Sequence, residues 1–204
     1  MAGKSIDHAF TATGNLGAAS DPTYAGVPSF LRRRFTKDVS GTDAAVWGIP
    51  FDSAVSNRPG ARFGPAAIRR ASMIFDNDPQ YPFGIDLFER MGVVDYGDCL
   101  LDYRLPETAH EAIRAEASAL VAKTGFLLTL GGDHSITWPL LQAHAERHGP
   151  LGLIHFDAHQ DTWPIAIAAD GSQRVDHGSF LIAAVEAGLV DPQRSIQVLS
   201  LIHI

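Results

Sequence analysis

The sequence contains a single cysteine, Cys99, among 204 residues. A disulfide framework needs cysteines in pairs, so the small, covalently stapled class of protein is excluded. We expect Cys99 to be a small, buried, apolar residue. Sparse cysteine is typical of a reducing compartment, and we predict a cytoplasmic protein.

Long apolar runs and an excess of positive charge are also missing. No run has the length of about 20 residues that crosses a bilayer, and the N-terminus lacks a basic start followed by an apolar core. Sixteen Lys and Arg against 23 Asp and Glu give a net charge of −7. This balance argues against both membrane and nucleic-acid partners, and it suits a small cationic molecule.

What is present is enough for one globular α/β domain. Hydrophobic residues make up 46% of the chain and charged residues 19%, which is typical of a folded protein. We interpret residues 1–42 as an N-terminal arm and residues 43–204 as the domain. In the arm we expect a short helix over 30–35, whose arginines, Arg32 to Arg34, form a solvated face or a partner contact and not a nucleic-acid patch.

Strand and helix patterns alternate along the domain. Strands are predicted at 44–50, 91–98, 126–130, 151–156 and 195–201, and helices at 65–75, 106–123, 135–148 and 179–188. We expect Ser135 to cap the third of these helices and Gly149 to end it. Residues 56–64 and 162–176 are expected to be loops. Such alternation predicts a mostly parallel sheet covered by helices on both faces.

Polar residues follow two of the predicted strands. "GGDHS" occupies 131–135 and "DAHQD" occupies 157–161. In an extended backbone, residues two apart point the same way, so Asp157, His159 and Asp161 can converge. Ligands of parallel sheets bind at the carboxyl ends of the strands, where His134 would join them.

Either segment alone is typical of a turn or a helix cap. Together they place carboxylates close to one another, which is costly unless a cation is present. Carboxylate and imidazole ligands without thiolate favour manganese, with zinc, iron and cobalt as alternatives. A carboxylate can bridge two ions, and such a pair can supply hydroxide at neutral pH. The pattern therefore indicates a hydrolase.

Two segments, "LGGDHSITWPLL" and "GLIHFDAHQDTW", resemble the arginase/agmatinase family of ureohydrolases. Further segments resemble its agmatinase branch, namely "VWGIPFD", "RPGARFGPAAIRRAS" and "DHGSFLIAAVEAGLVDPQRSIQV". The resemblance covers roughly 43–198. It implies a three-layer α-β-α sandwich, two Mn²⁺ ions per complete active site, and a homo-oligomer. It also implies hydrolysis of a guanidino group to urea and an amine, which for agmatine is putrescine, a polyamine precursor.

The resemblance also implies roles for individual residues. His134 and Asp161 would bind one manganese, His159 the other, and Asp157 would bridge both. Asp161 would accept a hydrogen bond from the attacking hydroxide. His177 matches the histidine that passes a proton to the departing amine. Read by itself, His177 would be a residue at the start of a helix.

The substrate is expected to be agmatine. Arginases place Ile-Asn after the D-A-H-x-D motif, and that asparagine helps to hold the α-carboxylate of arginine. Here the motif is followed by Thr162 and Trp163, which counts against arginine. The alternative is 4-guanidinobutyrate or a related guanidino acid. A zinc deacetylase of similar architecture is disfavoured, because such enzymes lack "GGDHS" at this spacing.

One family feature is missing from the sequence. Members carry a third motif, S-x-D-x-D-x-x-D-P, whose two aspartates complete the metal shells, and nothing after Asp161 matches it. The match also breaks after Val198, where "LSLIHI" follows. We therefore expect a C-terminally truncated chain that is itself inactive, while the complete protein would be active.

Overall fold

The computed structural model describes residues 15–16, 22–75 and 78–199. The chain forms two compact units, which are described separately. The first comprises residues 1–50, 63–99 and 120–130, and the second comprises 51–62, 100–119 and 131–204. Residues 1–14 and 17–21 of the predicted N-terminal arm lie outside the described residues, as do residues 200 and 201 of the predicted last strand.

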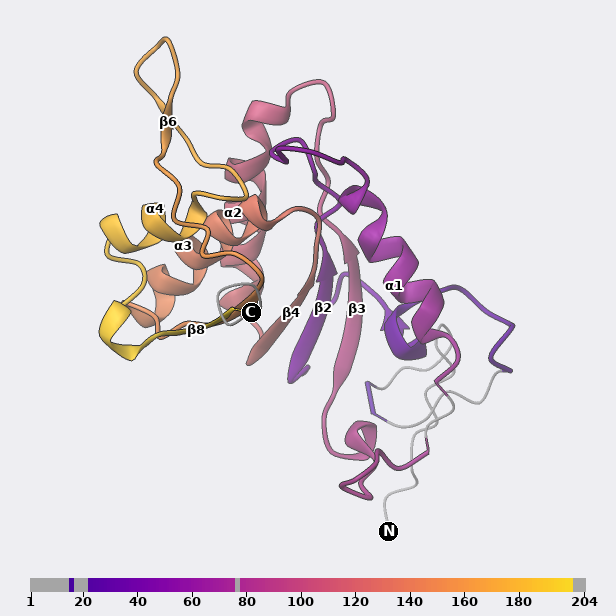
Figure 1. The fold of residues 1–204 in the computed structure, drawn as a ribbon. Helices are drawn as coiled ribbons and strands as arrows, with labels where there is room; N and C mark the ends of the chain where they lie inside the picture. Colours follow the sequence, from indigo (N-terminus) through magenta and orange to yellow (C-terminus); the bar gives the residue numbers. More distant parts are fainter. Residues whose placement is uncertain (1–14, 17–21, 76–77, 200–204) are drawn as a thin grey trace. The chain divides into compact units, whose positions relative to one another are not determined.

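The first unit is built on a four-stranded parallel sheet in the order β1-β3-β2-β4 (Figure 1). The strands are β1 (Arg34–Phe35), β2 (Ala44–Gly48), β3 (Val93–Asp98) and β4 (Phe126–Leu130). Every residue of the central strand β2 is buried, as its apolar sequence predicts. Strand β1 lies inside the predicted arm and pairs with β3, so this part of the arm is joined to the sheet.

Helix α1 (Gly64–Ser72) begins with Pro65 in its first turn, as predicted. It packs against the sheet through the buried Arg69 (Figure 1). The guanidinium binds Asp95 of β3 through two hydrogen bonds of 2.8 and 2.9 Å, and it binds Asp98 at 2.5 Å. Burial opposes the charge of Arg69, but the two carboxylates outweigh it and hold the pKa of Arg69 above its ordinary value. Helix and sheet are therefore joined by a buried ion pair.

The predicted helix over 30–35 is wrong. A 3₁₀ turn, η1 (Phe30–Arg32), is followed by extended backbone, because Leu31 and Arg32 have positive φ angles of 48° and 58° that no α-helix accommodates. The predicted solvated face is also wrong for Arg32 and Arg33, which are buried. The Arg33 guanidinium stacks 3.7 Å from the ring centroid of Phe88, in the 3₁₀ turn η3 (Leu87–Glu89).

The second unit contains most of α2 (Ala109–Val121), which follows the 3₁₀ turn η4 (Pro106–Thr108). It also contains η5 (His134–Ile136), α3 (Thr137–His148) and α4 (Phe180–Glu186). Helices α3 and α4 pack together around Leu141 and Phe180 (Figure 1). Gly149 ends α3 at a φ of 74°, as predicted. The predicted Ser135 cap is wrong, since the N-cap of α3 is Ile136, without a side-chain capping bond, and Asp133 caps the preceding η5.

The strands of the second unit form two small sheets. β5 (Ile154–Asp157) pairs in parallel with β8 (Ile196–Leu199). The 3₁₀ turn η6 (Pro192–Arg194) precedes β8 in the chain. β6 (Ala166–Ile167) and β7 (Gln173–Arg174) form a hairpin inside the segment predicted to be a plain loop. Phe156 of β5 is 76% exposed. Among the described residues, no helix is long and apolar enough to cross a membrane.

The buried ion pair of α1 generates a test. Replacing Arg69 with Met would leave the fully buried Asp95 without its cation, and we expect a loss of about 3–5 kcal/mol in the free energy of unfolding. The exposed neighbour Arg70 gives the control, because R70M removes the same charge from the same helix. Urea denaturation measures both. Equal effects of the two substitutions would contradict this account, and adding D95N to R69M should recover part of the loss.

Candidate metal centre

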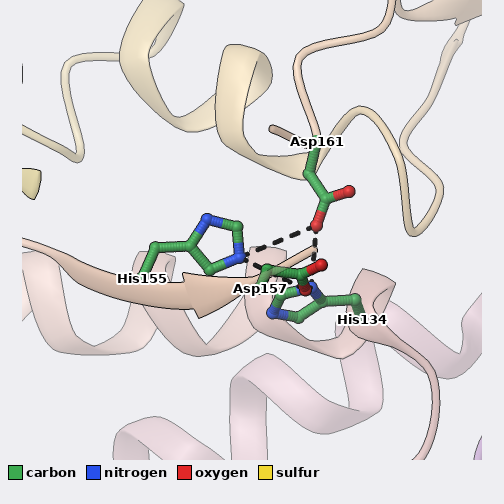
Figure 2. Close-up of side chains that lie close together, drawn as sticks. All are labelled: His134, His155, Asp157 and Asp161. Atoms are coloured by element: carbon green, nitrogen blue, oxygen red, sulfur yellow. Dashed lines mark hydrogen bonds and ion pairs between the residues drawn. The ribbon is translucent and has the colours of Figure 1, made fainter. Parts of the chain in front are cut away.

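Two imidazoles and two carboxylates converge in the second unit (Figure 2). They belong to His134, at the start of η5, to His155 and Asp157 of β5, and to Asp161 in the following loop. One ligand atom from each of the four lies within 4.8 Å of the others. The structure therefore brings together three residues predicted from the sequence, His134, Asp157 and Asp161, and adds His155.

The backbone explains this convergence. His155 and Asp157 are two residues apart on a strand, so both side chains point to the same side. Asp161 has a φ of 51°, in the left-handed region that aspartate tolerates better than most residues. Asp161 lies in the segment between β5 and α4. Its backbone carbonyl accepts a hydrogen bond from the N–H of Leu181 in α4, which ties this segment to the helix. The strand therefore positions the Asp157 carboxylate, and the loop after it brings the Asp161 carboxylate back to the same place.

The contacts in the cluster run from imidazole to carboxylate. His134 Nδ1 lies 2.8 Å from Asp161 Oδ2 and 3.2 Å from Asp157 Oδ2. Burial alone would raise the pKa of Asp157, but the His159 N–H and the nearby His134 outweigh it and hold that pKa below its usual value. Asp157 is therefore an anion at neutral pH, which is the form that binds a cation.

Asp133 of the "GGDHS" segment has a different role. Its carboxylate accepts hydrogen bonds from the backbone N–H groups of Ser135 (2.8 Å) and Ala54 (3.0 Å). These bonds fix the start of η5 and so the direction of His134. The acidic residue of this motif is a structural cap, and only the histidine reaches the cluster.

His159 lies apart from the four converging side chains. Its side chain is 72% exposed, and its Nδ1 is 3.7 Å from Asp157 Oδ1. Its metal-binding role therefore stays a prediction. His155 was missed by the sequence argument, although it occupies the same alternating register as Asp157, His159 and Asp161. The signal that could have identified His155 is a histidine inside an otherwise apolar strand. Its side chain is buried, with 5% exposure.

His177 belongs to a second group of polar contacts. Its Nε2 accepts a hydrogen bond from the Ser56 N–H (3.1 Å) and lies 3.0 Å from the Ser56 hydroxyl. The Trp163 ring stands edge-on to it, with 6.2 Å between ring centroids. A Cβ on Gly178 would lie 3.0 Å from the Trp163 ring, so glycine permits this approach. Helix α4 begins only at Phe180, so His177 precedes it.

The loop "SNRPGARFG" is held by the buried Asp52. Its carboxylate accepts bonds from the N–H groups of Gly60 (2.6 Å) and Arg62 (3.2 Å) and forms an ion pair with the Arg62 guanidinium. These bonds, led by that of the Arg62 side chain, hold the pKa of Asp52 below its usual value. Gly60 has a φ of 134°, which only glycine adopts readily. The loop is therefore structurally anchored.

A cavity of about 610 Å³ also lies in the second unit. Its walls include the acidic side chains of Glu107, Glu111 and Asp176, with Trp138 and Phe51 as apolar surface. None of the four clustered residues lines it. The acidic wall favours a cationic occupant, but Arg174 in the same wall reduces that preference.

The chain resembles known proteins over most of its length. Residues 42–198 match the arginase family. The chain is 48% identical over 193 residues to an agmatinase of Chromobacterium violaceum, which covers 94% of this chain and 59% of that protein. The chain therefore spans well under two thirds of that relative.

Two solved structures support the fold. A hypothetical agmatinase from Burkholderia thailandensis matches 94% of this chain and 60% of its own, with a TM-score of 0.87 and 45% identity. Proclavaminate amidino hydrolase from Streptomyces clavuligerus covers 87% of this chain and 57% of its own, with a TM-score of 0.80 and 36% identity. These likenesses confirm the predicted α/β fold class with a mostly parallel sheet. The chain belongs to the arginase family.

Proposed function

We propose that the protein is a manganese-dependent agmatinase that hydrolyses agmatine to putrescine and urea. The observation that carries this proposal is the cluster of His134, His155, Asp157 and Asp161 in a chain 48% identical to an agmatinase. The chain alone covers 59% of that relative, so the activity is proposed for the complete protein. An inactive partial chain is the second candidate.

The residues present fit a hard or borderline metal ion. Two carboxylates and two imidazoles without thiolate are donors that manganese accepts, with zinc, iron and cobalt as competitors. His155 Nε2 is buried without a hydrogen-bond partner in the described chain. The two carboxylates beside it have histidines and no described lysine or arginine as ion-pair partners, so a bound cation would balance their charge.

Each residue of the proposed site has a distinct task. His134, Asp157 and Asp161 would hold the ions, and His159 would join them as a further ligand. When bound, manganese would supply Lewis-acid chemistry by lowering the pKa of water and stabilising negative charge. Asp161 would accept a hydrogen bond from the attacking nucleophile and so orient it towards the guanidinium carbon.

His177 would deliver a proton to the departing alkyl amine. The backbone N–H of Ser56 donates to its Nε2, so in the neutral ring the proton resides on Nδ1. Ser56 thereby fixes the orientation of the imidazole. As the oxygen of the nucleophile bonds to the guanidinium carbon, the C–N bond to the alkyl chain breaks and its nitrogen takes the Nδ1 proton of His177. The Nε2 side of the ring takes up a proton in exchange through the Ser56 hydroxyl, 3.0 Å away, so the imidazole stays neutral while urea and the amine leave.

Trp163 supports the choice of agmatine over arginine. Trp163 stands where arginases have the asparagine that follows the D-A-H-x-D motif. Its indole is 59% exposed and lies beside His177. An aromatic ring offers no strong anchor to an α-carboxylate, whereas it can contact an alkyl chain or an ammonium group. 4-Guanidinobutyrate remains the alternative substrate. A homo-oligomer, a cytoplasmic location and a domain boundary near residue 43 also stay predictions.

The first test concerns the metal. We expect H134A, D157A, D161A and H159A each to reduce bound Mn²⁺ strongly, because each removes a proposed ligand. H148A is the control, since His148 is an exposed histidine at the end of α3. Metal content is measured after dialysis in the 204-residue chain and in a version completed to the length of its relatives. Unchanged content in D157A would contradict the proposed centre.

A second test concerns the substrate. The completed protein should release urea from agmatine and leave putrescine, with little action on arginine, because nothing at Trp163 replaces the carboxylate-binding asparagine. Urea release is compared for agmatine, arginine and 4-guanidinobutyrate. Preference for the last would move the assignment to the alternative, and comparable turnover of arginine would refute the argument from Trp163. The 204-residue chain, assayed in parallel, should be inactive.

A third test concerns His177. We expect H177A to lower kcat by about 10²–10⁴-fold, the usual contribution of a positioned proton donor. The Mn²⁺ content should be retained, because His177 is not among the clustered side chains. Stopped assays of urea release and metal analysis of the same sample separate the two effects. An unchanged rate would return His177 to a structural role before α4.

A further inference from the structure

We propose that His155 is a positioning residue, held by Gln197 in the Nε2–H tautomer so that it donates towards the carboxylates of Asp157 and Asp161. The inference rests on the proposed metal centre and adds to it two residues, one on β5 and one on β8. Residues His155 and Gln197 face each other directly across the parallel strand pair.

The tautomer follows from the hydrogen bonds of the Gln197 amide. Its Nε2 lies 2.9 Å from the backbone carbonyl of Gln160 and 2.9 Å from His155 Nδ1. A carbonyl only accepts, so the NH₂ side of the amide must face Gln160, and this settles which way the amide points. The same NH₂ group then donates to His155 Nδ1. With Nδ1 as the acceptor, the proton of the neutral ring resides on Nε2.

The other nitrogen points into the cluster (Figure 2). His155 Nε2 is 3.5 Å from Asp157 Oδ2 and 3.8 Å from Asp161 Oδ2. It is buried and has no hydrogen-bond partner in the described part of the chain. An N–H facing two carboxylates is attracted to both, whereas a lone pair in that place would be repelled. This electrostatic argument selects the same tautomer as the Gln197 contact, although it uses different atoms.

The geometry also separates this role from direct metal binding. A nitrogen that carries a proton cannot bind a metal, so His155 would act on the carboxylates and not on the ion. Closing the 3.5 Å separation from Asp157 by about 0.5 Å would give a normal hydrogen bond. Partners of this kind orient metal-binding carboxylates, and their loss typically costs about 10–100-fold in metal affinity.

The experiment reads the tautomer first. Long-range ¹H–¹⁵N correlation spectra of the purified, metal-free protein distinguish Nε2–H from Nδ1–H imidazoles, and the H155Q variant identifies the His155 signals. We expect the Nε2–H form in the unmodified protein. Q197L should shift His155 towards a mixture of tautomers, while Q193L should not, because Gln193 is exposed and outside this contact.

Metal affinity is the second readout, measured by the electron paramagnetic resonance of free Mn²⁺. We expect H155L to weaken Mn²⁺ binding by about 10–100-fold, and H155Q, whose amide can still donate, to retain most of the affinity. The Nδ1–H tautomer at His155, or unchanged affinity in H155L, would overturn the inference. The deciding spectrum is that of the unmodified protein, and H155Q serves only to assign it, so misfolding of H155L cannot protect the proposal.

The outcomes also separate this inference from the proposed function. Failure of the unmodified protein to bind Mn²⁺ would remove the metal centre and the role of His155 with it. Mn²⁺ binding by a protein whose His155 carries its proton on Nδ1 would leave the metal centre standing and overturn the positioning role alone.

Discussion

The close approach of Asp157 and Asp161 is the constraint on which the functional part of this structure depends. Like charges so placed repel one another, and partial burial increases that cost. The surrounding groups reduce it only in part. His134 contacts both carboxylates, and the His159 backbone N–H donates to Asp157. Both are weaker compensation than a full cation, so the arrangement is best explained by an ion that the residues are placed to hold.

Each unit contains a pair of neighbouring aspartates, and the two pairs differ in the groups that balance their negative charge. In the first, Asp95 and Asp98 share the guanidinium of Arg69, which supplies a permanent positive charge. In the second, no described lysine or arginine forms an ion pair with Asp157 or Asp161, whose partners are histidines. The first cluster joins a helix to a sheet, whereas the second leaves its negative charge available for a ligand.

Much of this could be predicted from sequence because local signals agreed with the final environment. The β4 strand matches its predicted bounds, because a short apolar run of five residues is typical of a buried strand. The helix-start preference of proline at Pro65 predicted the beginning of α1. Three of the four clustered residues were predicted, but the extended spacing behind that prediction ends with β5 at Asp157. Asp161 joins the cluster through a loop at a φ of 51°, and the predicted convergence of His159 with the two carboxylates is not observed. His155 was missed because its strand, "GLIHF", was interpreted as apolar core, although its imidazole is the buried polar group of that strand.

The failures have tertiary causes. The 30–35 segment has helix-compatible residues, but Leu31 N–H bonds to Ser72 and Arg33 stacks on Phe88, and contacts so distant in sequence leave no local pattern. The β6 and β7 strands have two residues each, too few for alternation to be recognised.

The end of the metal motif connects the chemistry to the choice of substrate. Asp161 belongs to the cluster, and Trp163, two residues later, contacts the ring of His177 and donates its N–H to the Gly178 carbonyl. Gly178 admits the indole because it has no Cβ. The segment that supplies Asp161 to the cluster therefore also fixes the surroundings of the proposed proton donor. In the proposed enzyme, a change at Trp163 would alter both the contact with the substrate chain and the orientation of His177, so selectivity and proton transfer would be physically linked.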